Sequence, residues 1–129
     1  MRRDFDLIRA ILLHIESAIQ FDAEDDWFQY EHDDQQAVGY SLHLMREQGL
    51  ITSHLSPEYS IAQSQSHHDV TITWAGHDFL DSIRDDEIWR KTKEGAKQAG
   101  GFTFDLLKSL SKGFLKKKIE HHTGIELDL

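Results

Sequence analysis

Residues 38–51 read VGYSLHLMREQGLI, and this stretch decides the fold. Val38, Leu42 and Met45 are spaced i, i+4, i+7, so they lie on one face of a helix. Gly49 is placed to adopt the left-handed conformation that ends a helix, and an extended segment follows it. A helix stopped by glycine and followed by a two-stranded ribbon is typical of the recognition helix and wing of a winged helix-turn-helix.

An amphipathic helix is predicted upstream, over residues 5–19, with Asp4 as its cap. Its apolar residues recur at helical spacing and form one stripe that is expected to face the core: Phe5, Ile8, Ile11, Leu12, Ile15 and Ile19.

An acidic and aromatic segment, residues 21–34, separates the two helices. It carries seven acidic residues around Trp27 and Tyr30, and these aromatics are expected to form a short strand. Asp33 or Asp34 is expected to cap the central helix, because carboxylates favour a helix N-terminus.

The central helix, residues 34–48, is followed by two predicted strands over residues 50–55 and 69–73. The segment between them, residues 55–69, holds the only proline of the chain and is rich in Ser and Gln. It is the expected wing.

The residues after the second strand predict a helix capped by Thr73, in which Gly76 permits a close backbone approach. The residues expected to face the core are Phe79, Leu80 and Ile83. Asp86 is expected to cap a further helix that contains Trp89 and ends at the pair Gly100 and Gly101.

A last helix is predicted over residues 104–122, with Thr103 as its cap and Gly124 at its end. The sequence thus predicts an α+β, mostly helical fold: a winged helix with a two-stranded wing and additional C-terminal helices. We expect a winged-helix core over residues 1–84 and a helical extension over residues 85–129, packed on the core or on a dimer partner.

Composition limits the function further. The chain has 129 residues and no cysteine, which excludes disulfides, thiolate metal sites and cysteine nucleophiles. No apolar run approaches the roughly 18 residues that span a bilayer, so we expect a soluble, cytoplasmic protein without a membrane partner.

The net charge of -9 is unevenly distributed. Residues 10–83 contain thirteen acidic residues and one basic residue, Arg46, whereas residues 84–122 contain ten basic and six acidic residues. Because DNA-binding surfaces concentrate Lys and Arg against phosphates, the predicted recognition region has the wrong sign for DNA.

Three stretches together resemble domain of unknown function family 2513, a family of small bacterial and phage proteins. They are residues 3–9 (RDFDLIR), residues 40–51, and residues 73–80 (TWAGHDFL) followed by Trp89. The resemblance covers about residues 3–90 and implies a winged-helix-like fold in a bacterial or phage setting, with no established activity. The stretch that contains Met45 and ends in Gly49 and Leu50 is also similar to winged-helix transcription regulators. In those proteins leucine is usual at the position of Met45.

The outward face of the central helix is the predicted partner-binding or DNA-reading face. Gln can read adenine and Arg can read guanine, so both kinds of partner are chemically possible. The residues of this face are Gln35, Gln36, Tyr40, His43, Arg46 and Glu47.

Metal binding and catalysis are not expected. The pairs His67-His68 and His121-His122 lack the i, i+3 or i, i+4 spacing of structural zinc ligands. His77 is interpreted as a packed histidine bonded to backbone, and Ser41 and Ser82 have no facing base. No cofactor is predicted.

Lysines recur every four residues along the last helix, at Lys108, Lys112 and Lys116. This basic helix could contact phosphates, anionic lipid or the acidic half of a second subunit. The simpler alternative is that its lysines form a solvated face without a partner. The opposite charges of the two halves favour a homodimer through the C-terminal helices.

Two functions remain open. The first is a non-enzymatic winged-helix module of bacterial or phage origin that binds another protein, with an acidic interface formed by Trp27, Tyr30, Asp33 and Asp34 beside the central helix. The alternative is a dimeric DNA-binding transcription regulator that uses the helix over residues 34–48 and the wing over residues 55–69.

Overall fold

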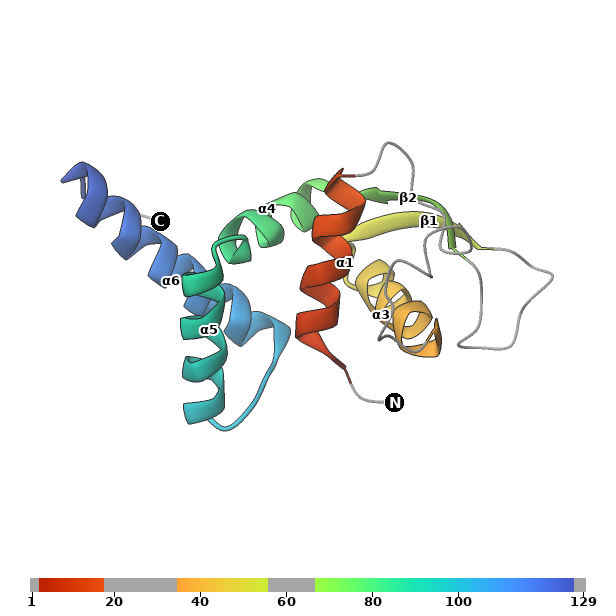
Figure 1. The fold of residues 1–129 in the computed structure, drawn as a ribbon, viewed down its shortest axis with the longest axis horizontal. Coiled ribbons are helices and arrows are strands. Elements are labelled where there is room, and N and C mark those ends of the chain that lie inside the picture. Colours follow the sequence, from red (N-terminus) through yellow and green to blue (C-terminus); the bar gives the residue numbers. More distant parts are fainter. Residues whose placement is uncertain (1–2, 18–34, 56–66, 127–129) are drawn as a thin grey trace. The chain divides into compact units, whose positions relative to one another are not determined.

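The computed structural model describes residues 3–17, 35–55 and 67–126 of the chain. In these residues the elements are α1 (Phe5–Ser17), α3 (Gln35–Glu47), β1 (Ile51–Leu55), β2 (His67–Ile72), α4 (Trp74–Ile83), α5 (Asp86–Gln98) and α6 (Phe104–Thr123) (Figure 1). The predicted α+β, mostly helical class is therefore confirmed. The winged-helix assignment stays a prediction.

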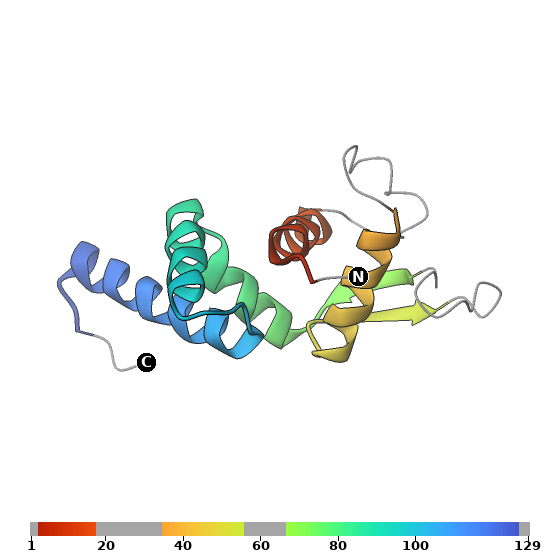
Figure 2. The same ribbon diagram turned by 90° about the horizontal axis from the view of Figure 1, so that it is seen from below.

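The chain divides into two compact units, Met1–Asp78 and Phe79–Leu129, and the division falls within α4. The predicted boundary after residue 84 stays a prediction, as does the packing of the C-terminal extension. In the first unit α1 packs against α3 and β2, and α3 packs against β1. Figure 2 shows α1 nearly end-on beside α3.

Helix α1 begins as predicted, because the Asp4 carboxylate accepts a hydrogen bond from the Leu7 amide at 3.1 Å. The predicted stripe is buried at Ile8, Ile11, Leu12 and Ile15, and Leu7 is buried in addition. Phe5 is only half-buried, and Ile19 lies outside the described residues.

The inward face of α3 is also the predicted one, since Val38, Leu42 and Met45 are at most 1% exposed. The helix ends in a Schellman motif, in which the Gly49 amide donates to Arg46 O at 3.1 Å and the Leu50 amide donates to Met45 O at 2.9 Å. Gly49 has a φ of 73°, which confirms its predicted left-handed conformation.

Strands β1 and β2 form an antiparallel ribbon with an irregularity between Thr52 and His54. Thr52 pairs with Thr71 and His54 pairs with His68, so β2 contains one extra residue. Asp69 adopts a φ of 50° at this point, a conformation that Asp tolerates better than most residues.

The ribbon corrects the predicted wing. β2 begins at His67 rather than residue 69, so the last residues assigned to the wing belong to the strand. His67 is buried, and its Nδ1 lies 2.8 Å from the Ser53 hydroxyl across the ribbon. Residues 56–66 of the predicted wing lie outside the described residues.

Thr73 joins the end of α3 to the start of α4. Its hydroxyl donates to the Gly49 carbonyl and accepts from the Gly76 amide, which confirms its predicted role as a cap. Its own amide donates to Leu50 O at 2.9 Å. One threonine therefore fixes both helix ends at the edge of the ribbon.

The second unit contains the end of α4 with α5 and α6. Phe79 lies against Phe104, with ring centroids 4.8 Å apart, and the buried hydroxyls of Ser82 and Ser111 are 3.0 Å apart. Thr103 and Gly124 bound α6 as predicted.

The predicted cap of α5 was wrong by one residue. Asp85, not Asp86, caps the helix, with its carboxylate accepting from the Ile88 amide at 3.0 Å. Asp85 has an extended backbone, which an N-cap requires, and Asp86 is the first residue of the helix.

Asp85 also binds Lys118 of α6, with 2.5 Å between Oδ2 and Nζ. The hydrogen bond from Lys118, together with that from the Ile88 amide, lowers the pKa of the Asp85 carboxyl below its ordinary 3.8. The same bond raises the pKa of Lys118 above its ordinary 10.5. This ion pair links the start of α5 to the last third of α6.

We expect Lys118→Met to lower the melting temperature over a defined pH window. The Asp85 contribution is present above pH 3.8 and is lost as the pH falls through its lowered folded pKa. The Lys118 contribution is present below pH 10.5 and is lost as the pH rises through its raised folded pKa. The difference between wild type and variant should therefore be constant near neutral pH and shrink at both extremes.

Calorimetric scans across this pH range measure the difference. Lys117→Met removes an exposed neighbouring cation and is the matched control, expected to melt close to wild type at every pH. Parallel pH profiles for wild type and Lys118→Met would contradict the ion pair.

None of the helices that the structure describes combines the length and apolarity that a membrane crossing needs.

Candidate functional site

The outward face of α3 carries most of the residues predicted for it. Gln36, Arg46 and Glu47 are exposed, whereas Tyr40 and His43 are half-buried. His43 Nε2 lies 3.5 Å from Glu47 Oε1, one helical turn further along, and their side chains are 40% and 61% exposed. The predicted Gln35 begins α3, and its side chain lies outside the described residues.

The C-terminal end of this face borders an open groove of about 370 Å³. Its lining comes from α3, from the turn after α3, from the first residues of β1 and from the residue before α4. The lining residues are His43, Arg46, Glu47, Gly49, Ile51, Thr52, Ser53 and Thr73. Two hydroxyl-bearing threonines, a serine, a guanidinium and a carboxylate give this groove both hydrogen-bond donors and acceptors.

Local sequence explains why these side chains converge. The Schellman motif at Gly49 turns the chain from α3 into β1, so Arg46 and Thr52 line the same groove. Thr73 closes the groove because it bonds to the carbonyl of Gly49. The Ser53 hydroxyl lies 2.8 Å from Nδ1 of buried His67.

Trp74 is the residue that the sequence reasoning missed. It is the first residue of α4, follows Thr73 of the groove directly, and is 84% exposed. The helical period contained the signal: Phe79, Leu80 and Ile83 point inward, and Trp74 falls on the opposite side of the helix. A tryptophan this exposed is unusual, because the indole ring is largely apolar.

The predicted acidic interface falls outside the part of the chain that the structure describes. Its members Trp27, Tyr30, Asp33 and Asp34 lie outside the described residues, and so does the predicted strand through the aromatics. The acidic interface therefore stays a prediction.

The basic helix is α6, and its three predicted lysines differ in their surroundings. Lys108 is half-buried with its ammonium 5.1 Å from the centre of the Phe104 ring, and Lys112 is exposed. Lys116 lies 4.0 Å from Glu120. Two of the three lysines thus have a partner within α6, and the homodimer through the C-terminal helices stays a prediction.

The residues considered for catalysis differ in their exposure to solvent. His77 is exposed, so its interpretation as a packed histidine was wrong; its backbone amide donates to Thr73 O at 2.9 Å. Ser41 and Ser82 are buried. Within residues 3–17, 35–55 and 67–126 the His, Asp and Glu side chains form no group of three suited to a metal ion.

A family model described as "Hypothetical protein (DUF2513)" matches residues 2–102, about three quarters of the chain. The chain belongs to the DUF2513 family. This confirms the resemblance carried by residues 3–9, 40–51 and 73–80. The family match includes the groove and Trp74, whereas α6 lies beyond it.

A relative from Haemophilus influenzae, named "Uncharacterized protein", is 30% identical over 122 residues. The alignment covers 92% of this chain and 99% of the relative, so the α6 region has a counterpart in that protein. A bacterial relative of nearly equal extent supports a bacterial origin. No solved structure matches the chain.

Proposed function

We propose that this member of the DUF2513 family is a non-enzymatic interaction module that binds another protein through Trp74 and the adjoining groove. The observation that carries this proposal is the 84% exposure of Trp74 directly beside Thr73 of the groove. Burial of such a ring against a partner removes a large apolar area from water.

The composition of this surface is that of a binding hot spot with a polar rim. Trp and Arg are the residues most enriched among side chains that dominate binding energy, and Trp74 and Arg46 provide one of each. Exposed Arg46 can donate several hydrogen bonds to carbonyl or carboxylate oxygens of a partner. Thr52 and Thr73 supply the hydroxyls of a rim.

The partner that fits this surface is basic overall, with an apolar patch to cover Trp74. Residues 10–83 hold thirteen acids and one Arg, and this excess attracts a cationic protein over long range. Association should therefore slow as salt is added, while the buried ring governs dissociation.

DNA binding is the rival function, and the exposed Gln36 and Arg46 on one helix face favour it. One titration of labelled random duplex DNA across a salt series distinguishes DNA binding from protein binding. Binding that weakens steeply with salt and is lost in Arg46→Ala would favour the regulator. Undetectable binding at low salt supports the protein-binding module.

The partner is found by placing a photo-crosslinking amino acid at the exposed position 75, next to an intact Trp74, in the native host. The captured protein is then purified and titrated calorimetrically against wild type and Trp74→Ala. We expect Trp74→Ala to weaken binding about 30-fold or more, since a hot-spot truncation costs at least about 2 kcal/mol.

Ile125→Ala is the matched control, because Ile125 is a large apolar residue that is 59% exposed on the second unit. The affinity of the Ile125→Ala variant for the partner should stay within about twofold of the wild-type affinity. Equal affinities for wild type and Trp74→Ala would remove Trp74 from the interface and overturn the proposed function.

A further inference from the structure

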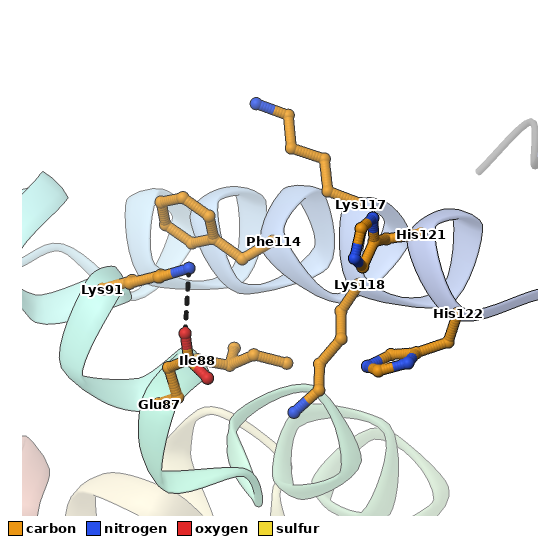
Figure 3. Close-up of a pocket in the computed structure, with 8 residues that line it drawn as sticks. All are labelled: Glu87, Ile88, Lys91, Phe114, Lys117, Lys118, His121 and His122. Carbon is orange, nitrogen blue, oxygen red and sulfur yellow. Dashed lines mark ion pairs between the residues drawn. The ribbon is translucent and has the colours of Figure 1, made fainter.

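A second cavity, of about 470 Å³, lies between α5 and α6 in the second unit (Figure 3). A volume in this range suits a small molecule. The α5 side contributes Glu87, Ile88 and Lys91, and the α6 side contributes Phe114, Lys117, Lys118, His121 and His122.

The cavity has an apolar floor. Ile88 is buried, Phe114 is half-buried, and they come from the two facing helices. In Figure 3 the Ile88 side chain extends from α5 with the Phe114 ring above it and the Lys118 stem next to its tip, before His122. This floor suits the hydrocarbon or aromatic body of a ligand.

The lining is cationic. The lining contains three lysines and two histidines but one carboxylate, that of Glu87. Lys91 is paired with Glu87 at 3.2 Å and Lys118 with Asp85 at 2.5 Å, so both lysines are held in position. Lys118 keeps N–H donors beyond the one used by Asp85, because an ammonium has three.

Two of these groups converge on one end of the floor. Figure 3 shows that Lys118 and His122 point toward α5, whereas Lys117 points away from it. An ammonium and an imidazole on the same side of an apolar floor are donors placed for one anionic group. An extended polyanion fits less well, because Glu87 and Asp85 at the start of α5 would repel its further charges.

We propose that this cavity binds a small organic anion whose apolar body rests on Ile88 and Phe114 and whose carboxylate, sulfonate or phosphate accepts hydrogen bonds from Lys118 and His122. This site is independent of the surface around Trp74.

The probe for this site is 8-anilinonaphthalene-1-sulfonate, which joins an aromatic body to one sulfonate and fluoresces when removed from water. Titration of the full chain should saturate at one probe per chain. His122→Ala and Phe114→Ala should each weaken binding by roughly tenfold, through loss of a charge-assisted hydrogen bond and of apolar contact respectively.

His122→Lys keeps an N–H donor at the same place and should retain most of the affinity. Lys112→Ala is the matched control, because Lys112 is an exposed cation of α6 that does not line the cavity. Amide chemical shifts of the wild-type chain, followed during the same titration, should change first around Ile88, Phe114 and His122, which separates this site from non-specific adsorption of the dye.

Three outcomes would overturn the site. Equal affinity of wild type and His122→Ala, with equal binding of uncharged N-phenyl-1-naphthylamine, would mean an apolar patch alone. Shift changes outside α5 and α6 would place the anion elsewhere. Binding to phosphatidylglycerol vesicles that is lost in Lys112→Ala but kept in His122→Ala would assign the cations of α6 to a lipid surface.

Discussion

Gly76→Ala is expected to destabilise the protein by about 3 kcal/mol or more, because no space exists for the added methyl group. A Cβ at this position would lie 2.1 Å from the Leu50 carbonyl oxygen and 2.7 Å from Ile72 Cγ2. The nearer atom belongs to the backbone and accepts a hydrogen bond from the Thr73 amide at 2.9 Å. It cannot move away without breaking the bond that joins the ribbon to α4.

Urea denaturation of wild type and variant measures this loss. Gly113→Ala is the matched control, since Gly113 lies inside α6 with nothing within 4 Å of an added Cβ. There the substitution should stabilise the chain by about 0.5–1 kcal/mol, the intrinsic preference of a helix for Ala over Gly. A Gly76→Ala variant as stable as wild type would show that the start of α4 does not pack against Leu50 and Ile72.

The same substitution links the fold to the proposed function. Gly76 lies two residues after Trp74, and the Gly76 amide bonds to the Thr73 hydroxyl. A shift of this turn would move both the end of the groove and the exposed ring. Partner affinity should therefore fall together with stability in Gly76→Ala, whereas Trp74→Ala should lower affinity alone.

The sequence predicted those parts of the fold that depend on local signals. Helix caps, helix-ending glycines and the spacing of apolar residues act within a few residues of one another, so Asp4, Gly49, Thr73 and Gly76 could be assigned their roles without a structure. The one-residue error at Asp85 has the same local origin. Two adjacent aspartates satisfy the capping pattern equally, and only the backbone conformation distinguishes them.

The remaining errors involve contacts between residues distant in the sequence. His67 was assigned to the wing, yet it lies buried in β2 with its Nδ1 2.8 Å from the Ser53 hydroxyl across the ribbon. Lys118 was given no partner by the sequence, because its partner Asp85 lies 33 residues away. Apolar periodicity and capping contain no information about such pairs.

The candidate site was predicted in part. The α3 face follows from the inward direction of Val38, Leu42 and Met45, so His43, Arg46 and Glu47 could be placed on the outer side. The groove could not be foreseen, because it requires the end of α3, the start of β1 and Thr73 to meet in space. Trp74 was assigned to neither face of its helix, although its spacing from Phe79, Leu80 and Ile83 places it on the opposite side.

The second large effect is expected for Leu42→Ala, which should destabilise the protein by about 3 kcal/mol, within the range of about 2–5 kcal/mol measured for buried leucines. Leu42 is 0% exposed and lies on the inward face of α3, and this helix packs against α1 and β1. The truncation removes apolar contacts and leaves a cavity that the two neighbouring elements can fill only by moving.

Leu44→Ala changes the same residue type two positions further along, where the side chain is half-buried, and should cost about 1 kcal/mol or less. Met45→Leu keeps volume and apolarity and should also be tolerated. Equal losses for Leu42→Ala and Leu44→Ala in urea denaturation would mean that α3 is rotated about its axis. Such a rotation would turn His43 and Arg46 away from the groove. Comparing the free energies of unfolding of these two leucine variants therefore also tests the geometry on which the proposed binding surface depends.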